Sequence, residues 1–162
     1  MPLYRLLYRS EIALNGSKDQ IDHQIDQIVS ASEQSNHLSG LTGALIASGG
    51  VFIQALEGPL GALEATFEKI CLDLRHKRVN LIELAAAEER IFPEWSMIRV
   101  AQGAQMIEIC TVVGVRESGR LDTSTTSALV SLMRNILLTK SAGSLDNEVA
   151  AGASAAIRLP DR

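Results

Sequence analysis

The sequence predicts an α+β fold, in which two helices cover one face of a sheet of four or five strands. Short apolar segments with the alternation or β-branched content of strands are separated by two longer segments with helical periodicity. Glycine and proline residues end several of the strand segments. A chain of 162 residues, 46% of them hydrophobic, also has enough apolar side chains to build the core of one domain.

The first segment with strand character covers residues 3–10 (LYRLLYRS), and the turn-forming residues NGSKD follow it closely. We expect a helix from Asp19 to about Asn36, because residues of one kind recur there at steps of three and four. The positions that share one face of this helix are Ile21, Ile25, Ile28, Ser32 and Asn36. That face therefore begins apolar and ends polar.

A hairpin and a second helix are expected next. Residues 40–48 and 51–58 have the composition of two buried strands, and Gly49 and Gly50 between them tolerate the positive φ angles of a tight turn. A Gly-Pro pair ends the second strand, and a helix is expected over residues 60–77. The apolar stripe of this helix consists of Leu63, Phe67, Ile70 and Leu74.

Two further strands complete the predicted sheet. We expect them over residues 79–90 and 95–102, joined through the sequence IFPE. The resulting order is βαββαββ, and two crossover helices on one face of such a sheet form the ferredoxin-like arrangement. Residues 1–102 are therefore expected to form one domain.

The C-terminal part of the chain divides into two segments. Residues 103–140 are expected to form a helical extension. Within it, residues 104–115 fit a helix or a strand equally well, whereas residues 123–139 fit a helix that a Ser/Thr cluster caps. The apolar stripe of the helix consists of Leu129, Leu132, Met133, Ile136 and Leu137. We expect this stripe to dock on the open face of the sheet or on another protomer. Residues 141–162 are small and weakly periodic, and we expect a flexible tail there.

Charge and composition argue against several classes of partner. The net charge of -4 and pI near 5.4, without a Lys/Arg cluster, disfavour a nucleic-acid partner. Arginines interrupt the N-terminal apolar residues, unlike those of a signal peptide, and no stretch is long and apolar enough to span a bilayer. We therefore expect a cytoplasmic protein that does not bind membranes. Cys71 and Cys110 lack the spacing of a metal or redox motif, so we expect buried thiols, no disulfide and no metal.

A glutamine in the middle of an apolar strand is the first sign of a functional site. Gln54 lies in FIQALEGP, and a buried amide without partners costs about 1–3 kcal/mol. An exposed position would explain Gln54 too, since most polar residues in strands face solvent. Other polar residues that the fold could bring near it are Tyr8, Ser32, Asn36, Lys69, Asp73 and His76. With Ile28 and Ile70 as aliphatic walls, they could form a pocket between the two helices for a flat heterocycle.

Five segments across residues 3–100 carry a specific resemblance. They are LYRLLYRS, SEQSNHLSGLTGALI, VFIQALEG, DLRH and RIFPEWSM. In order and spacing they resemble the BLUF family of bacterial blue-light sensors, which bind flavin adenine dinucleotide (FAD). The matching positions are Tyr8, Asn36, Gly40 to Gly43, Gln54, Leu56 to Gly58, Arg75, His76, Trp95 and Met97. Agreement at so many separated positions is improbable by chance.

The resemblance implies non-covalently bound FAD and a photoactive pair. In the family, the glutamine that matches Gln54 is hydrogen-bonded both to the flavin and to the tyrosine that matches Tyr8. After an electron and a proton have passed from Tyr8 to the excited flavin and returned, the amide of Gln54 is left rotated or tautomerised. Absorption then shifts to the red. An amide suits this role because it carries a donor and an acceptor on one planar group.

The resemblance also implies a set of cofactor contacts. Asn36 would bond the C4 carbonyl and N3 edge of the flavin, and Ile28 and Ile70 would sandwich the ring. The other expected contacts are Ser32 beside the ring, Lys69 and Asp73 at the C2 carbonyl and ribityl side, and Arg75 and His76 toward the rim. Gln34 and Ser35 depart from the family, where Asn or His and Arg are common, so flavin affinity or the dark-recovery rate is expected to differ from that of relatives.

Trp95 and Met97 have two explanations. They are two residues apart in a predicted strand, so they are expected to face the same way, and a pair in the core accounts for them. In the family, either side chain can lie near the switching glutamine, and the pair relays the signal outward. The sequence leaves open which of the two faces the flavin.

The sequence thus predicts a photoreceptor without catalytic turnover. No Gly-rich phosphate loop and no nucleophile paired with histidine is apparent, which disfavours a ferredoxin-like enzyme such as an acylphosphatase. A light-insensitive regulatory domain that binds a small molecule is the alternative, and it predicts a colourless protein. About sixty residues after the sensor leave no room for a fused enzyme domain. Output is therefore expected through a homo-oligomer or a downstream signalling protein, which the sequence does not identify.

Overall fold

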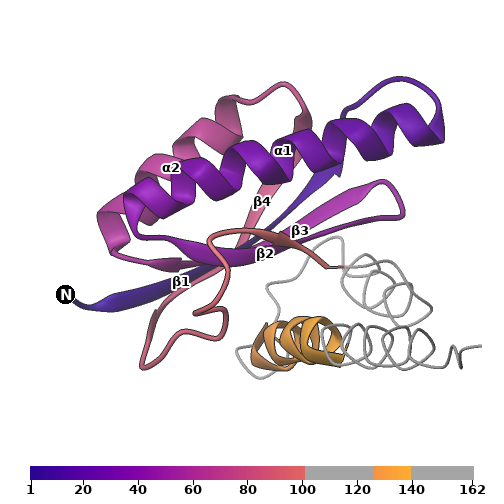
Figure 1. The fold of residues 1–162 in the computed structure, drawn as a ribbon. Coiled ribbons are helices and arrows are strands. Elements are labelled where there is room, and N and C mark those ends of the chain that lie inside the picture. The colour runs from indigo at the N-terminus through magenta and orange to yellow at the C-terminus, as the bar shows by residue number, and fades with distance from the viewer. Residues whose placement is uncertain (101–125, 140–162) are drawn as a thin grey trace, which may run out of the picture.

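The computed structural model describes residues 1–100 and 126–139, and Figure 1 shows three layers. A five-stranded sheet lies in the middle. Helices α1 (Lys18–Ser39) and α2 (Leu60–Leu72) cover one face of the sheet. The helix formed by residues 126–139, here termed the C-terminal helix, lies against the opposite face.

The sheet has the connectivity that the sequence predicts. Its strands are β1 (Leu3–Ile12), β2 (Thr42–Ser48), β3 (Val51–Gly58), β4 (His76–Ala87) and β5 (Ile98–Arg99). The order across the sheet is β4-β1-β3-β2-β5, and neighbouring strands are antiparallel except for β5, which runs parallel to β2. The first four strands and the two helices follow the ferredoxin-like arrangement. The predicted α+β class is confirmed.

Helix α1 begins and ends where the sequence provides caps. The side chain of Ser17 accepts a hydrogen bond from the backbone N–H of Gln20, and the side chain of Gln20 accepts one from the backbone N–H of Ser17. At the other end, Gly40 has a φ of 68°, a left-handed conformation that glycine adopts without steric cost. The buried positions of α1 include Ile28 and Asn36. The predicted change from an apolar to a polar face is therefore confirmed.

Apolar side chains are buried on both faces of the sheet, because successive residues of a strand point to opposite sides. On β1, Leu6 and Tyr8 face α1 and α2, whereas Leu7 faces the C-terminal helix. Strand β3 is buried along its whole length. The face of the sheet opposite α1 and α2 carries a second core. The C-terminal helix contributes four buried residues to this core, which are Leu129, Val130, Met133 and Leu137. The predicted docking of this helix on the open face of the sheet is thus confirmed.

Helix α2 ends at Leu72, so the prediction that it extends to residue 77 was wrong. The carboxylate of Asp73 accepts hydrogen bonds from the backbone N–H and the guanidinium of Arg75, both at 2.9 Å. Such a local side-chain contact competes with the next helical turn. Leu74 consequently lies outside the apolar stripe and is 91% exposed, and His76 begins β4 instead of continuing the helix.

The last predicted strand, over residues 95–102, is also shorter than expected. Only Ile98 and Arg99 belong to β5 and pair with β2. The preceding residues form a turn, in which the backbone N–H of Trp95 donates to the carbonyl of Phe92 at 3.3 Å. The chain therefore enters the sheet only after residue 97.

Two single-residue expectations were wrong as well. Leu132 is 37% exposed, because the buried stripe of the C-terminal helix passes to one side of it. Cys71 is exposed near the end of α2 and is not a buried thiol. Cys110, and the expectations for residues 104–115 and 141–162, lie outside the described residues.

Candidate functional site

A pocket lies between α1 and α2 over the sheet and has a volume of about 210 Å³. Ile28 on α1 and Ile70 on α2 contribute its aliphatic walls. Its polar lining consists of Tyr8, Ser32, Ser35, Asn36, Gln54, Thr66, Lys69, Asp73, Arg75 and His76. Every residue that the sequence led us to assign to cofactor binding lines this pocket, although their individual contacts with flavin stay predictions.

Tyr8 and Gln54 form a buried pair within the pocket. They are direct partners on β1 and β3, so their side chains project from the same face of the sheet. The hydroxyl of Tyr8 donates to Oε1 of Gln54, and Nε2 of Gln54 donates to Sδ of Met97 at 3.5 Å. All three side chains are buried. The glutamine amide therefore connects an oxidisable phenol to the residue that precedes β5.

The environment of Tyr8 keeps its phenol protonated. Burial raises the pKa of Tyr8 far above its usual range, and the negative charge of Asp73 raises it further. The rings of Phe67 and His76 pack beside it, with centroid distances of 5.7 and 6.1 Å. Tyr8 is consequently a neutral hydrogen-bond donor to Gln54 at all ordinary pH values.

Asn36 supplies a second amide near the C-terminal end of α1. Its Nδ2 donates to the backbone carbonyl of Ser96 at 2.8 Å, and its own backbone carbonyl accepts from the N–H of Leu41 at 2.9 Å. Because these contacts use one amide hydrogen of the side chain, the amide oxygen is available to accept from a ligand.

The end of α2 adds charged groups to the pocket. Arg75 pairs with Asp73 at 2.6 Å, and the side-chain hydrogen bond from Arg75 holds the pKa of Asp73 below its usual value. Nδ1 of His76 lies 2.8 Å from Oγ of Ser10, and the imidazole packs on the ring of Phe52 with a centroid distance of 4.7 Å. Burial lowers the pKa of His76, which favours the neutral imidazole.

Trp95 and Met97 do not face the same way, contrary to expectation. Met97 is buried in the core beneath α1 and α2, next to Gln54, whereas Trp95 packs against the opposite core. The reason is that residues 93–97 form a turn and bends, so the alternation of a strand does not apply to them. Met97 is thus the residue on the side of the sheet that carries the pocket, and its proximity to a bound flavin stays a prediction.

The two positions that depart from the family differ in location. Ser35 lines the pocket, whereas Gln34 lines a separate cavity with His37 and Ser96. Sequence reasoning missed Ala31 and Thr66, which also line the pocket. Neither has a distinctive chemistry, but helical spacing could have identified them, since each lies three or four residues from Ile28 or Ile70.

Residues 1–100 and 126–139 offer neither a cluster of metal ligands nor a helix suited to cross a membrane. In that part of the chain, no three His, Cys, Asp or Glu side chains lie close enough to hold a metal ion. No helix in it combines the length and the hydropathy of a membrane span.

Comparisons with known proteins agree with the geometry of the pocket. The family model for sensors of blue light using FAD (BLUF) matches residues 3–98. The subunit alpha of a photoactivated adenylate cyclase from Euglena gracilis is 42% identical over 57 residues, which are 35% of this chain and 6% of that protein. The blue light- and temperature-regulated antirepressor BluF from Escherichia coli (strain K12) is 37% identical over 82 residues, or 51% and 19% of the two chains. The chain thus spans less than a fifth of either relative.

Solved structures extend the likeness beyond the matched domain. The dark-state structure of BlrB, a BLUF protein, has a TM-score of 0.64 and 33% identity, and the match covers 85% of this chain and 97% of BlrB. The photo-activated state of BlsA has the same fold, with a TM-score of 0.69 at 24% identity over 82% of this chain and 94% of BlsA. With a family model that matches more than half of its length, this chain belongs to the BLUF family of blue-light sensors that use FAD.

Proposed function

We propose that light sensing in this protein depends on a switch formed by Tyr8 and Gln54, and that the chain signals to a partner without catalysing a reaction itself. The observation that carries the proposal is the buried chain of hydrogen bonds from Tyr8 through Gln54 to Met97. Such a chain has two alternative arrangements, because an amide that turns over exchanges its donor and its acceptor.

The lining of the pocket fits FAD. Ile28 and Ile70 lie on neighbouring helices and can cover a flat ring, and the amide oxygen of Asn36 can accept from the N3–H of a flavin. Lys69 contributes an ammonium group that can donate to the C2 carbonyl or the ribityl hydroxyls of FAD, whereas the charge of Arg75 is paired with Asp73. Bound flavin would absorb blue light and, once excited, accept an electron and a proton from a neighbouring donor.

Tyr8 is the donor in this scheme. Its raised pKa keeps the phenolic proton in place in the dark, and the hydrogen bond to Gln54 gives that proton a direct acceptor. When the electron and the proton have returned to Tyr8, the amide of Gln54 can remain turned over, with its NH₂ toward Tyr8 and its oxygen toward the sulfur of Met97. In that arrangement the hydrogen bond from Gln54 to Met97 is lost.

In this proposal, the chain passes the light signal to a partner. We propose that residues 1–102 are the sensor domain, that residues 103–140 present the C-terminal helix to a second copy of the chain or to a downstream signalling protein, and that residues 141–162 are a tail. The related cyclase and antirepressor support a role in signalling, although neither identifies the partner of this chain. A cytoplasmic location stays a prediction of the sequence.

The test is the absorption spectrum of the purified protein before and after blue light. We expect a yellow protein with non-covalently bound FAD and a small, reversible red shift. Tyr8→Phe and Gln54→Leu should each retain FAD and lose the normal shift, because the first removes the proton donor and the second the reversible amide. Tyr4→Phe is the matched control, since Tyr4 lies on the same strand and packs at the edge of the same core without lining the pocket.

Three results would contradict the proposal. A colourless protein that FAD cannot reconstitute would mean that the pocket does not hold flavin. A normal photocycle in either the Tyr8 or the Gln54 variant would exclude the switch. Loss of the red shift in the Tyr4 control would mean that the effect of removing a hydroxyl is not specific to Tyr8.

A further inference from the structure

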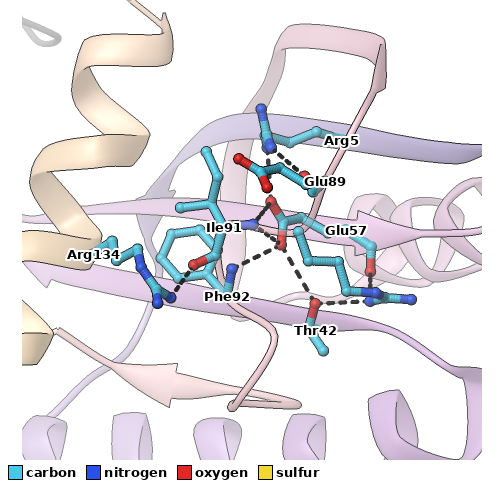
Figure 2. Close-up of polar contacts among 8 residues, drawn as sticks. Arg5, Thr42, Glu57, Glu89, Ile91, Phe92 and Arg134 are labelled. Atoms are coloured by element: carbon cyan, nitrogen blue, oxygen red, sulfur yellow. Dashed lines mark hydrogen bonds and ion pairs between the residues drawn. The ribbon is translucent and has the colours of Figure 1, made fainter.

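The segment between β4 and β5, residues 88–97, is fixed to the sheet by a buried carboxylate. Glu57 is 0% exposed, and its carboxylate accepts hydrogen bonds from the backbone N–H of Ile91 at 2.8 and 2.9 Å and from that of Phe92 at 2.9 Å. Nε of Arg5 donates to the same carboxylate at 2.8 Å, as Figure 2 shows. We term residues 88–97 the connecting loop. Its backbone is thus attached to β3, the strand that carries Gln54.

Arg90 attaches the connecting loop to two more elements. One guanidinium nitrogen donates to Oγ1 of Thr42 at 2.8 Å and to the carbonyl of Glu57 at 2.9 Å, and the other donates to the carbonyl of Gly40 at 2.9 Å. The first half of the loop is therefore bound to β2, β3 and the end of α1. These contacts hold residues 90–92 against the sheet, whereas residues 93–97 have fewer anchors to it.

The C-terminal helix packs its buried apolar residues against Phe92 of the connecting loop, and Arg134 adds polar contacts to the same side of the loop. Arg134 donates to the backbone carbonyl of Ile91 and to both carboxylate oxygens of Glu94, at 3.0 and 3.1 Å, and its guanidinium lies 5.9 Å from the ring centroid of Trp95. In Figure 2, Arg134 reaches Ile91 from the helix while Glu57 approaches from the sheet. The N–H of Ile91 is therefore bound to β3, and its C=O to the C-terminal helix.

The far end of the connecting loop touches the proposed switch. Sδ of Met97 accepts the hydrogen bond from Gln54, and the carbonyl of Trp95 accepts one from the N–H of Gly43 at 2.9 Å. A short run of backbone, residues 91–97, thus joins the residue that contacts Gln54 to the residues that contact Arg134.

We propose that Arg134 is a positioning residue that couples the C-terminal helix to the switch. When the amide of Gln54 turns over, Met97 loses its donor, and any movement of residues 91–97 alters the three contacts of Arg134. Coupling free energies are reciprocal, so loosening the helix must also change the balance between the two arrangements of Gln54. This inference rests on the proposed function, since it assumes that Gln54 has two arrangements.

Hydrogen exchange of residues 126–139, measured in the dark and under blue light beside the spectra, tests the coupling. In the parent protein we expect the exchange rates to differ between dark and light. Arg134→Met should keep FAD and the red shift, exchange about tenfold faster in the dark and lose the light dependence, because the lost hydrogen bond to Ile91 and the partly exposed ion pair with Glu94 together correspond to about that factor. The dark-recovery rate should change in the same variant.

Conservative variants and a control separate coupling from simple loss of stability. Arg134→Lys should keep part of the light dependence, because an ammonium can reach one acceptor but cannot form the planar fork. Glu94→Gln removes only the negative charge that pairs with Arg134. It should weaken the light dependence, as Arg134→Met does, but to a smaller extent. Arg78→Met removes an exposed ion pair with Glu11 at the opposite end of β4 and should behave like the parent protein.

Two results would overturn the inference while leaving the proposed function intact. One is a photocycling Arg134→Met variant that exchanges faster by the same factor in dark and light and so retains the light dependence, because Arg134 would then only stabilise the helix. The other is parent-like exchange and recovery in both the Met and the Gln variants. Absence of a red shift in the parent protein would instead contradict the proposed function itself.

Discussion

Replacing Glu57 by glutamine should destabilise the fold by about 3 kcal/mol. The substitution keeps the shape of the side chain but removes the charge that pairs with Arg5. One end of the amide must now present N–H groups either to Nε of Arg5 or to the backbone N–H groups of Ile91 and Phe92, so that donors face donors. Neutralising one partner of a buried ion pair costs about 3–5 kcal/mol, a figure that already includes the lost charge-assisted hydrogen bonds. Relaxation of the loop brings the expected loss to the lower end of this range.

Urea unfolding followed by far-UV circular dichroism measures the effect. With a slope of about 2 kcal/mol/M, the midpoint should fall by about 1.5 M. Glu64→Gln is the matched control, because Glu64 is exposed on α2 and its replacement should change stability by less than about 0.5 kcal/mol. A loss below about 1 kcal/mol for Glu57→Gln would show that the carboxylate does not anchor the connecting loop in the way described.

Three further predictions concern the pocket and the C-terminal helix. Asn36→Ala should weaken FAD binding about tenfold or more relative to Ser35→Ala, because it removes an amide that can pair with the ring, and equal dissociation constants would contradict this. Because burial lowers the pKa of His76, the unfolded chain binds more protons just below the ordinary value of 6.5, so stability should fall as pH falls from about 7 to 5. His76→Gln should flatten that slope, and an unchanged slope would rule out His76 as its source. Met133→Ala should cost about 2–5 kcal/mol and Leu132→Ala less than about 1 kcal/mol, since only Met133 is fully buried; similar losses in thermal unfolding would refute this.

The layout of the fold and the pocket was predictable because strong local signals agreed with each other. The face of α1 changes from Ile28 to Asn36 within the helical period, and a glutamine in an otherwise apolar strand needs a partner. Both patterns correctly indicated a polar pocket under the helices. The same logic applied to Glu57, which lies in the same buried strand as Gln54, would have identified the second buried polar group.

Features that depend on tertiary contacts were not predictable from periodicity. Leu74 continues the apolar spacing of α2, but the contact between Asp73 and Arg75 ends the helix before it. The opposite directions of Trp95 and Met97 follow from the turn before β5, where the alternation of a strand no longer holds. Arg134 resembles any surface arginine of an amphipathic helix in sequence, and only its position opposite the connecting loop distinguishes it.

Strand β3 is buried on both faces, so its even-numbered and odd-numbered side chains contact different parts of the molecule. Even-numbered positions such as Gln54 face the pocket, and odd-numbered positions such as Glu57 face the side where the C-terminal helix docks. Insertion or deletion of one residue between them would exchange the two sets of side chains. Chimeras that give this sensor another output segment should therefore keep β3 intact and join new sequence after residue 100. A junction at that point leaves the residues on the pocket side of the sheet unchanged.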